Sequence, residues 1–88
     1  MLKVEQMQSA RGNYIANQFK IFTNEGKYFQ SYNSIIVFIP MGGKIQLDEK
    51  YWNYSRTTGK YRNIFLGEDR KDTEKKIKNG EYILTDLN

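Results

Sequence analysis

The residue types best suited to binding another molecule are concentrated between positions 50 and 66. This stretch has five aromatic and four basic residues and no acidic residue. Basic side chains beside aromatic rings contact phosphates and stack on bases, and tyrosine, tryptophan and arginine dominate protein–protein hot spots. The same composition also suits core aromatic residues beside a solvated basic face. The candidate partner-binding residues are Tyr51, Tyr54, Arg56, Lys60 and Arg62.

Most catalytic and metal sites are excluded, because the chain has no histidine and no cysteine. Ser-His-Asp and Cys-His catalysis and the usual zinc, haem and iron–sulfur sites cannot be built. Residues Thr57–Lys60 look like the end of a phosphate-binding loop, but Tyr54 and Tyr61 stand where that loop needs glycine and serine or threonine. The acidic residues at 48–50 and 69–71 lack the further carboxylates of a metal-dependent nuclease. We expect a protein that is not an enzyme and has no metal or cofactor.

Size, composition and charge favour one small, ordered domain. The chain has 88 residues, and at 15% aromatic residues it is too aromatic for a disordered segment. We expect residues 1–88 to form a single domain, with residues 1–13 as a frayed lead or a short strand. The net charge of +4 permits binding to nucleic acid or to an acidic protein. The longest apolar run, Ile35–Ile39, is too short to span a membrane, and no signal-peptide pattern follows the N-terminus, so we expect a cytoplasmic protein with no membrane partner.

The first half of the chain has the alternating pattern of strands. In Tyr14–Thr23 the apolar residues recur with a period of two, and Ser34–Ile39 is rich in β-branched residues. Short turns with glycine are expected at 24–27 and 40–43, and a bulge or tight bend is expected at Asn33–Ser34. With further strands near 28–32 and 44–47, the pattern predicts an antiparallel sheet of three or four strands.

Two short helices are expected in the second half, so the predicted fold class is α+β with both helices on one face of the sheet. The first starts at Ser55 or Thr57, continues to about Leu66 and stops at Gly67. Its buried stripe would be Thr57, Tyr61, Ile64 and Phe65, with Arg56, Lys60 and Asn63 on the outer face and Arg62 near its edge. The second starts near Asp69 or Asp72 and ends at Asn79, before Gly80. Residues 82–84 would return as a short strand or an ordered tail.

The chain from Tyr28 to Asn88 resembles a group of short, mostly uncharacterised proteins from phages and prophages of Gram-positive bacteria. The resemblance is carried mainly by the Trp-x-Tyr-Ser-x-Thr-Thr segment at 52–58 and by the ending Leu-Thr-Asp-Leu-Asn at 84–88. That group often has aspartate where this chain has Asn53. The resemblance implies a phage origin and action in the bacterial cytoplasm, and it supplies no catalytic site.

Small size, many tyrosines and the phage resemblance together lead to one functional hypothesis. We expect a phage-encoded inhibitor of a bacterial defence system that binds a host protein stoichiometrically, such as a CRISPR effector. The alternative is a small nucleic-acid-binding phage accessory protein that uses the same face. A third possibility, sequestration of a nucleotide, requires a basic pocket that sequence cannot show.

Overall fold

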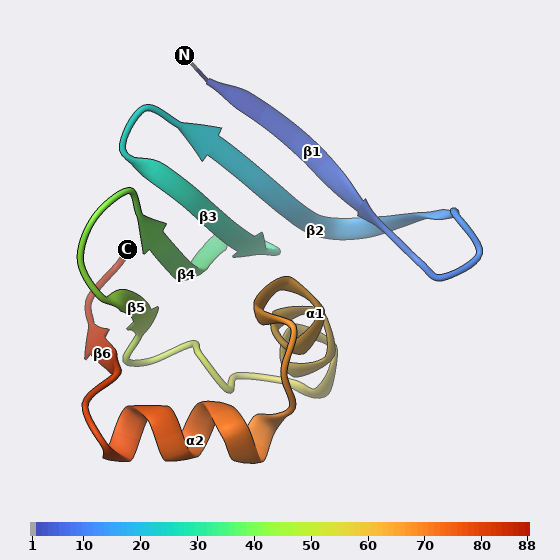
Figure 1. The fold of residues 1–88 in the computed structure, drawn as a ribbon. Coiled ribbons are helices and arrows are strands. Elements are labelled where there is room, and N and C mark those ends of the chain that lie inside the picture. The colour runs from blue at the N-terminus through green and yellow to red at the C-terminus, as the bar shows by residue number, and fades with distance from the viewer. Residues whose placement is uncertain (1) are drawn as a thin grey trace.

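The computed structural model describes residues 2–88 and has an α+β fold (Figure 1). Met1, which the single-domain prediction includes, lies outside the described residues. The elements in chain order are β1 (Lys3–Gln8), β2 (Tyr14–Thr23), β3 (Gly26–Ser31), β4 (Ser34–Pro40), β5 (Ile45–Asp48), α1 (Arg56–Leu66), α2 (Arg70–Lys78) and β6 (Tyr82–Thr85). Among residues 2–88, no helix is both long and apolar enough to cross a bilayer.

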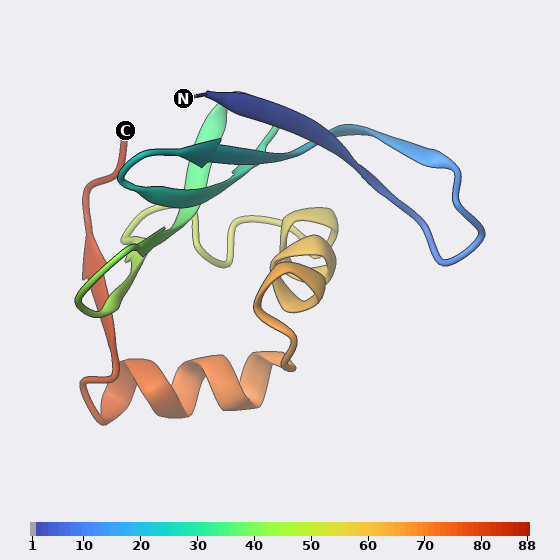
Figure 2. The same ribbon diagram turned by 45° about the horizontal axis from the view of Figure 1, so that its top comes forward.

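The strands form one six-stranded sheet in the order of the sequence, β1 to β6. Neighbours pair antiparallel from β1 to β5, whereas β6 pairs parallel to β5 because both helices lie between them in the chain. The sheet curls around α1, and α2 lies on the same side (Figure 2). The predicted α+β class is therefore confirmed, but the predicted three or four antiparallel strands are too few, because the sheet has six strands and is mixed.

The two strands that the sequence did not place firmly are the edge strands. Of the two alternatives for the start of the chain, the short strand is right, since β1 pairs with β2 along Lys3↔Phe22 to Gln6↔Phe19. Its polar residues hide the alternation that marks a half-buried strand. For β6, the partner lies far away in the sequence, at Ile45↔Tyr82, so no local pattern indicates the pairing.

The turn from β2 to β3 requires glycine at position 26. Gly26 has a φ of 149°, and a Cβ there would collide with the carbonyl oxygen of Ile39 on β4. The turn from β3 to β4 uses Tyr32 at a φ of 56°, so the predicted bend lies at Tyr32–Asn33. The ladder also shifts register between Phe29 and Gln30.

Helix α1 packs on the sheet with a different face from the one predicted. Ser55 caps its start by accepting a hydrogen bond from the Thr58 N–H at 3.1 Å, and Gly67 ends it at a φ of 70°. Tyr61 and Phe65 point inward as predicted, and Phe65 stacks on Phe29 with ring centroids 5.6 Å apart.

The predictions of buried Thr57 and Ile64 are wrong, because both are exposed. Their places are taken by Thr58 and Arg62, which complete a 3–4 spacing with Tyr61 and Phe65. The hydroxyl of Thr58 is satisfied in the core by Ser31 on β3 at 2.9 Å.

A single carboxylate joins the end of α1 to α2 and β6. Glu68 is 7% exposed and accepts hydrogen bonds from Thr73 Oγ1 at 2.6 Å, Tyr82 Oη at 2.7 Å and Lys76 Nζ at 2.8 Å. Burial alone would raise the pKa of Glu68, but these three hydrogen bonds hold it below its ordinary value. Of the two predicted caps, Asp69 is the one that starts α2, through the Asp72 N–H at 2.9 Å.

Candidate functional site

Two open grooves flank the start of α1 and share its first residues, Ser55 and Arg56. Four of the five predicted binding residues line one or both of the grooves with side chains that solvent or a partner can reach: Tyr51, Tyr54, Arg56 and Lys60. The start of the helix is fixed by the Ser55 cap, so the two grooves meet on a rigid element.

The first groove, here called the tyrosine groove, has a volume of about 690 Å³. It runs between the β3–β4 turn and residues 51–57. Tyr51 and Tyr54 form one wall, with their rings edge to face and their centroids 5.6 Å apart. Tyr54 is 64% exposed, and Tyr32 from the turn is 44% exposed. The groove therefore offers aromatic faces and phenol hydroxyls to a partner.

A buried aspartate positions the segment that carries these tyrosines. Asp48, at the end of β5, is 1% exposed and accepts from the N–H groups of Lys50 and Tyr51 at 3.1 and 2.9 Å. Its other oxygen accepts from the Leu87 N–H at 2.8 Å and from Asn88 Nδ2 at 3.0 Å. Burial alone would raise the pKa of Asp48, but these hydrogen bonds hold it below its ordinary value.

The second groove, here called the basic groove, has a volume of about 1010 Å³ and lies between α1 and the first turn of α2. Five cationic residues and one acidic residue line it, which gives a local charge of +4, equal to that of the whole chain with its 14 basic and 10 acidic residues. The other nine basic and nine acidic residues therefore cancel. The six charged lining residues are Arg56, Lys60, Arg62, Asp69, Arg70 and Lys71.

The prediction that Arg62 contacts a partner is wrong, because its side chain is 0% exposed. Its guanidinium lies beneath the basic groove, over the ring of Trp52 at 5.2 Å. Nη1 donates to the Trp52 carbonyl at 2.6 Å and to Asn53 Oδ1 at 3.3 Å, and Nη2 donates to Asn63 Oδ1 at 2.9 Å. Burial lowers the pKa of Arg62, and the charge of Arg70 lowers it further.

Several residues of the grooves were not among the predicted binding residues. Arg70 and Lys71 belong to a stretch that reads as a solvated connector, and they reach the site only because Glu68 folds α2 back beside α1. Tyr32 arrives through an unusual turn conformation. Asn53 accepts a hydrogen bond from Arg62 through its amide oxygen. The one sign of this position in the sequence is that the phage group which the chain resembles often has aspartate there.

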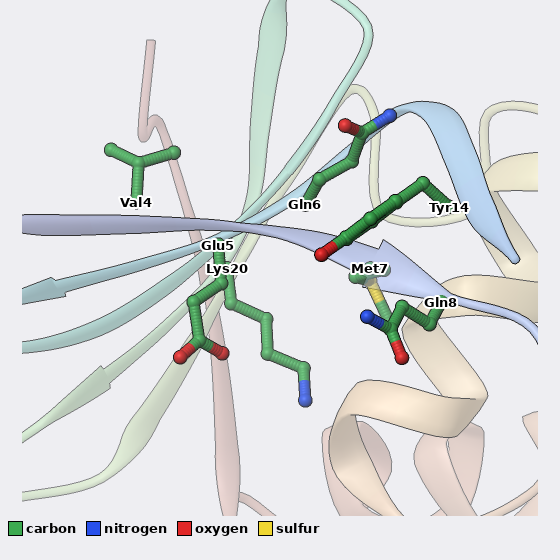
Figure 3. A pocket seen from close by; sticks show the side chains of 7 residues that line it. All are labelled: Val4, Glu5, Gln6, Met7, Gln8, Tyr14 and Lys20. Atoms are coloured by element: carbon green, nitrogen blue, oxygen red, sulfur yellow. The ribbon is translucent and has the colours of Figure 1, made fainter. Parts of the chain in front are cut away.

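A further hollow of about 540 Å³ lies at the β1–β2 hairpin (Figure 3). It is lined by residues 4–8, Tyr14 and Lys20, and it contains none of the predicted binding residues. Glu5 and Lys20 project together to one side of the sheet there, and Tyr14 projects to the other (Figure 3). Within residues 2–88, no three acidic side chains gather as a potential metal site.

The chain belongs to a family of unknown function, DUF8033, whose model matches residues 2–81. The match includes both grooves and every predicted binding residue. No curated protein and no solved structure matches the chain.

Proposed function

We propose that this member of the family acts as a stoichiometric binding protein, with the two joined grooves at the start of α1 as its contact surface. The observation that carries the proposal is the meeting of the tyrosine groove and the basic groove at Arg56. Aromatic rings and all of the chain's net positive charge adjoin there. This combination suits an acidic protein surface, since buried tyrosine and arginine anchors supply most of the energy of protein interfaces.

The partner that we propose is a host defence protein, such as a CRISPR effector, in the cytoplasm of a phage-infected bacterium. This setting is supported by the phage resemblance of residues 52–58 and 84–88. The mode of action is supported by the side chains that the grooves offer, which are cations, phenols and amides suited to recognition. Tyr54 and Arg56 are the proposed anchors, because both are exposed and lie where the grooves join.

The test compares a double substitution in the contact surface with a matched one elsewhere. The tagged protein is used to capture its partner from host lysate, and the complex is weighed by native mass spectrometry. Tyr54→Ala with Arg56→Ala should weaken the complex at least about 100-fold, since each hot-spot truncation costs about 2 kcal/mol or more. Tyr14→Ala with Arg11→Ala, in exposed residues near the β1–β2 turn, should leave it intact. The proposal would be refuted if no one-to-one complex formed, or if the two double substitutions weakened the complex equally.

Nucleic-acid binding is the second candidate, and the concentration of charge in the basic groove favours it. Phosphate contacts release counterions, so affinity for DNA or RNA should fall steeply with salt, with a slope of about −0.9 per phosphate contacted. A gel shift at two salt concentrations measures this. Binding that persists unchanged after Arg56→Ala with Lys60→Ala would exclude the basic groove as the nucleic-acid surface.

A further inference from the structure

Arg62 is a fully buried cation whose side chain pairs directly with no carboxylate of the described residues; Glu68 and Glu74 act on it only from a distance. Of the ion pairs formed within residues 2–88, none involves Arg62. Its partners are one backbone carbonyl and two amide oxygens, all uncharged, and its Nε–H has no acceptor. A buried charge normally requires a paired opposite charge, because burial removes it from water. The positive field of Arg62 therefore remains available at the floor of the basic groove.

The same guanidinium fixes the orientation of two amide side chains in that groove. Asn53 and Asn63 both turn their Oδ1 atoms to Arg62, so the NH₂ groups on the opposite side of each amide must point away from it. Both asparagines line the groove, and neither NH₂ group has an acceptor in the described chain. Two oriented donors thus face a groove with a cationic floor.

The guanidinium of Arg62 lies next to Gly59, where the helix carries no side chain. A Cβ at position 59 would lie 3.8 Å from both Nη atoms and 3.8 Å from Asn53 Oδ1. The rim is formed by exposed Arg56, Lys60 and Lys71. The acid of the groove, Asp69, caps α2 through one of its oxygens. Its single negative charge is outnumbered by the five cations of the lining.

We propose that the basic groove binds a phosphate group, which accepts hydrogen bonds from the NH₂ groups of Asn53 and Asn63 and pairs with the Lys60 ammonium. Arg62 is a positioning residue here, because it orients the two amides from below and does not contact the ligand. The inference rests on the contact surface proposed above and names the chemistry that one of its halves recognises. It holds whether the phosphate belongs to a free nucleotide or to a nucleic-acid backbone.

The donor set matches a phosphate in number and charge. The fork of Arg62 is occupied by neutral oxygens, and the Nε of Arg70 pairs with Glu74 at 3.2 Å. The remaining donors of the groove are the two amides, the ammonium groups of Lys60 and Lys71, and the exposed guanidinium of Arg56. A phosphate has enough oxygens to accept from several of them at once, whereas a carboxylate has two, so a titration with acetate distinguishes the two anions.

The decisive variant is Asn63→Asp, which keeps an oxygen on Arg62 but replaces the NH₂ donor with a negative charge. Inorganic phosphate, pyrophosphate, ATP and a short DNA single strand are titrated separately into the ¹⁵N-labelled protein. The side-chain amide resonances of Asn53 and Asn63 report binding. We expect a saturable shift with at least one phosphate compound, and an affinity at least about ten-fold lower in Asn63→Asp, because a hydrogen bond to a charged group is lost. Asn13→Asp, which makes the same charge change in an exposed turn, should stay within about two-fold.

A second variant tests the positioning role of Arg62 independently of the fold. Arg62→Met keeps an unbranched side chain but removes the charge and the hydrogen bonds to Trp52, Asn53 and Asn63, so we expect it to lose some stability. We expect its phosphate affinity to fall at least about ten-fold under conditions where urea unfolding shows that the variant is still folded. If the affinity is instead unchanged, Arg62 does not orient the amides.

The outcomes separate this inference from the proposed partner binding. Saturable binding of ATP or pyrophosphate without DNA binding assigns the phosphate to a small ligand, and a salt-dependent DNA complex assigns it to a nucleic acid. The phosphate site would be overturned if none of the four probes gave a saturable shift up to about 10 mM, or if acetate bound as tightly as the phosphate compounds. Protein capture through Tyr54 and Arg56 could still succeed in that case.

Discussion

Replacing Glu68 with glutamine should destabilise the fold more than any conservative exchange of a surface acid. The carboxylate is 7% exposed and serves Thr73, Tyr82 and Lys76 at once. Glutamine keeps the size of the side chain but has one acceptor oxygen and no charge. Its NH₂ group cannot accept the Thr73 hydroxyl proton, so the charge-assisted bond from Thr73 is lost and that proton is left with the longer bond to the Asp69 carbonyl at 3.2 Å. The other hydrogen bonds lose charge assistance.

The magnitude follows from the two hydroxyl donors. A hydrogen bond to a charged group contributes about 1.5–3 kcal/mol and a neutral one about 1 kcal/mol. Loss of the Thr73 bond and weakening of the Tyr82 bond at 2.7 Å therefore cost about 2 kcal/mol. We count nothing for Lys76, because pairs with an exposed ammonium are screened by solvent. For a domain of this size, about 2 kcal/mol lowers the melting temperature by about 8–16 °C.

The difference in the free energy of unfolding between the parent and Glu68→Gln should depend on pH. The pKa of Glu68 is held below its ordinary value of 4.5 by hydrogen bonds that outweigh its burial. A depressed pKa contributes stability that is complete above the pKa of the unfolded chain and is lost as the pH falls through that of the folded protein. The gap between parent and Glu68→Gln should therefore be full at neutral pH and should narrow in acid. Asp48, whose pKa is also lowered, should keep both proteins acid-sensitive.

Urea unfolding followed by the fluorescence of Trp52 measures the free energy of unfolding at each pH. Glu74→Gln is the matched control, since it removes the same charge from an exposed pair with Arg70, and we expect it to cost no more than about 0.5 kcal/mol. A loss below about 0.5 kcal/mol in Glu68→Gln at neutral pH would refute this reasoning, as would a gap that does not change in acid.

Three further substitutions or titrations test separate parts of the fold. Gln18→Met should raise the free energy of unfolding by about 1 kcal/mol, because both amide atoms of the fully buried Gln18 have no hydrogen-bond partner among residues 2–88; a urea midpoint below that of the parent would contradict this. Gly26→Ala should lower the melting temperature by at least about 10 °C, through its positive φ and the collision with Ile39, and an unchanged melting curve would show that the β2–β3 turn can relax. Burial and the neighbouring Glu68 carboxylate raise the pKa of Tyr82 to about 12, so the stability that its neutral form contributes should be lost as the pH rises through that value. Ultraviolet difference spectra of Tyr82→Phe against the parent should assign that late ionisation, and identical spectra would show that Tyr82 titrates normally.

Those parts of the fold that depend on local pattern could be predicted from the sequence. The alternation in Tyr14–Thr23 and the β-branched run from Ser34 mark β2 and β4 through local strand propensity and spacing. The burial itself does not alternate, since β4 buries the adjacent Ile36 and Val37 and β2 buries Gln18. The cap at Ser55 and the stop at Gly67 mark α1 for equally local reasons. The β5–β6 pairing depends instead on residues separated by both helices, and no local pattern encodes it.

The candidate site divides in the same way. Arg56 and Lys60 are exposed, as the helical spacing predicts, and Tyr54, which precedes the helix, is exposed as well. Arg62 was misplaced because a charged residue is normally at the surface. Its burial depends on the Trp52 ring and on three oxygens that only the folded chain brings together. The proposed phosphate-binding role of Asn53 and Asn63 depends on their hydrogen bonds to Arg62. Residue spacing alone therefore could not predict it.

The parallel pairing of β6 with β5 also orders events during synthesis on the ribosome. Strands β1 to β4 are joined by short turns and can pair as soon as they leave the exit tunnel. The Ile45↔Tyr82 contact must wait until both helices have emerged, and it closes a long loop. The hydrogen bond from Tyr82 to Glu68 then fixes α2 beside α1. In a nascent chain the antiparallel strands can therefore pair first, and the parallel strand β6 joins the sheet last.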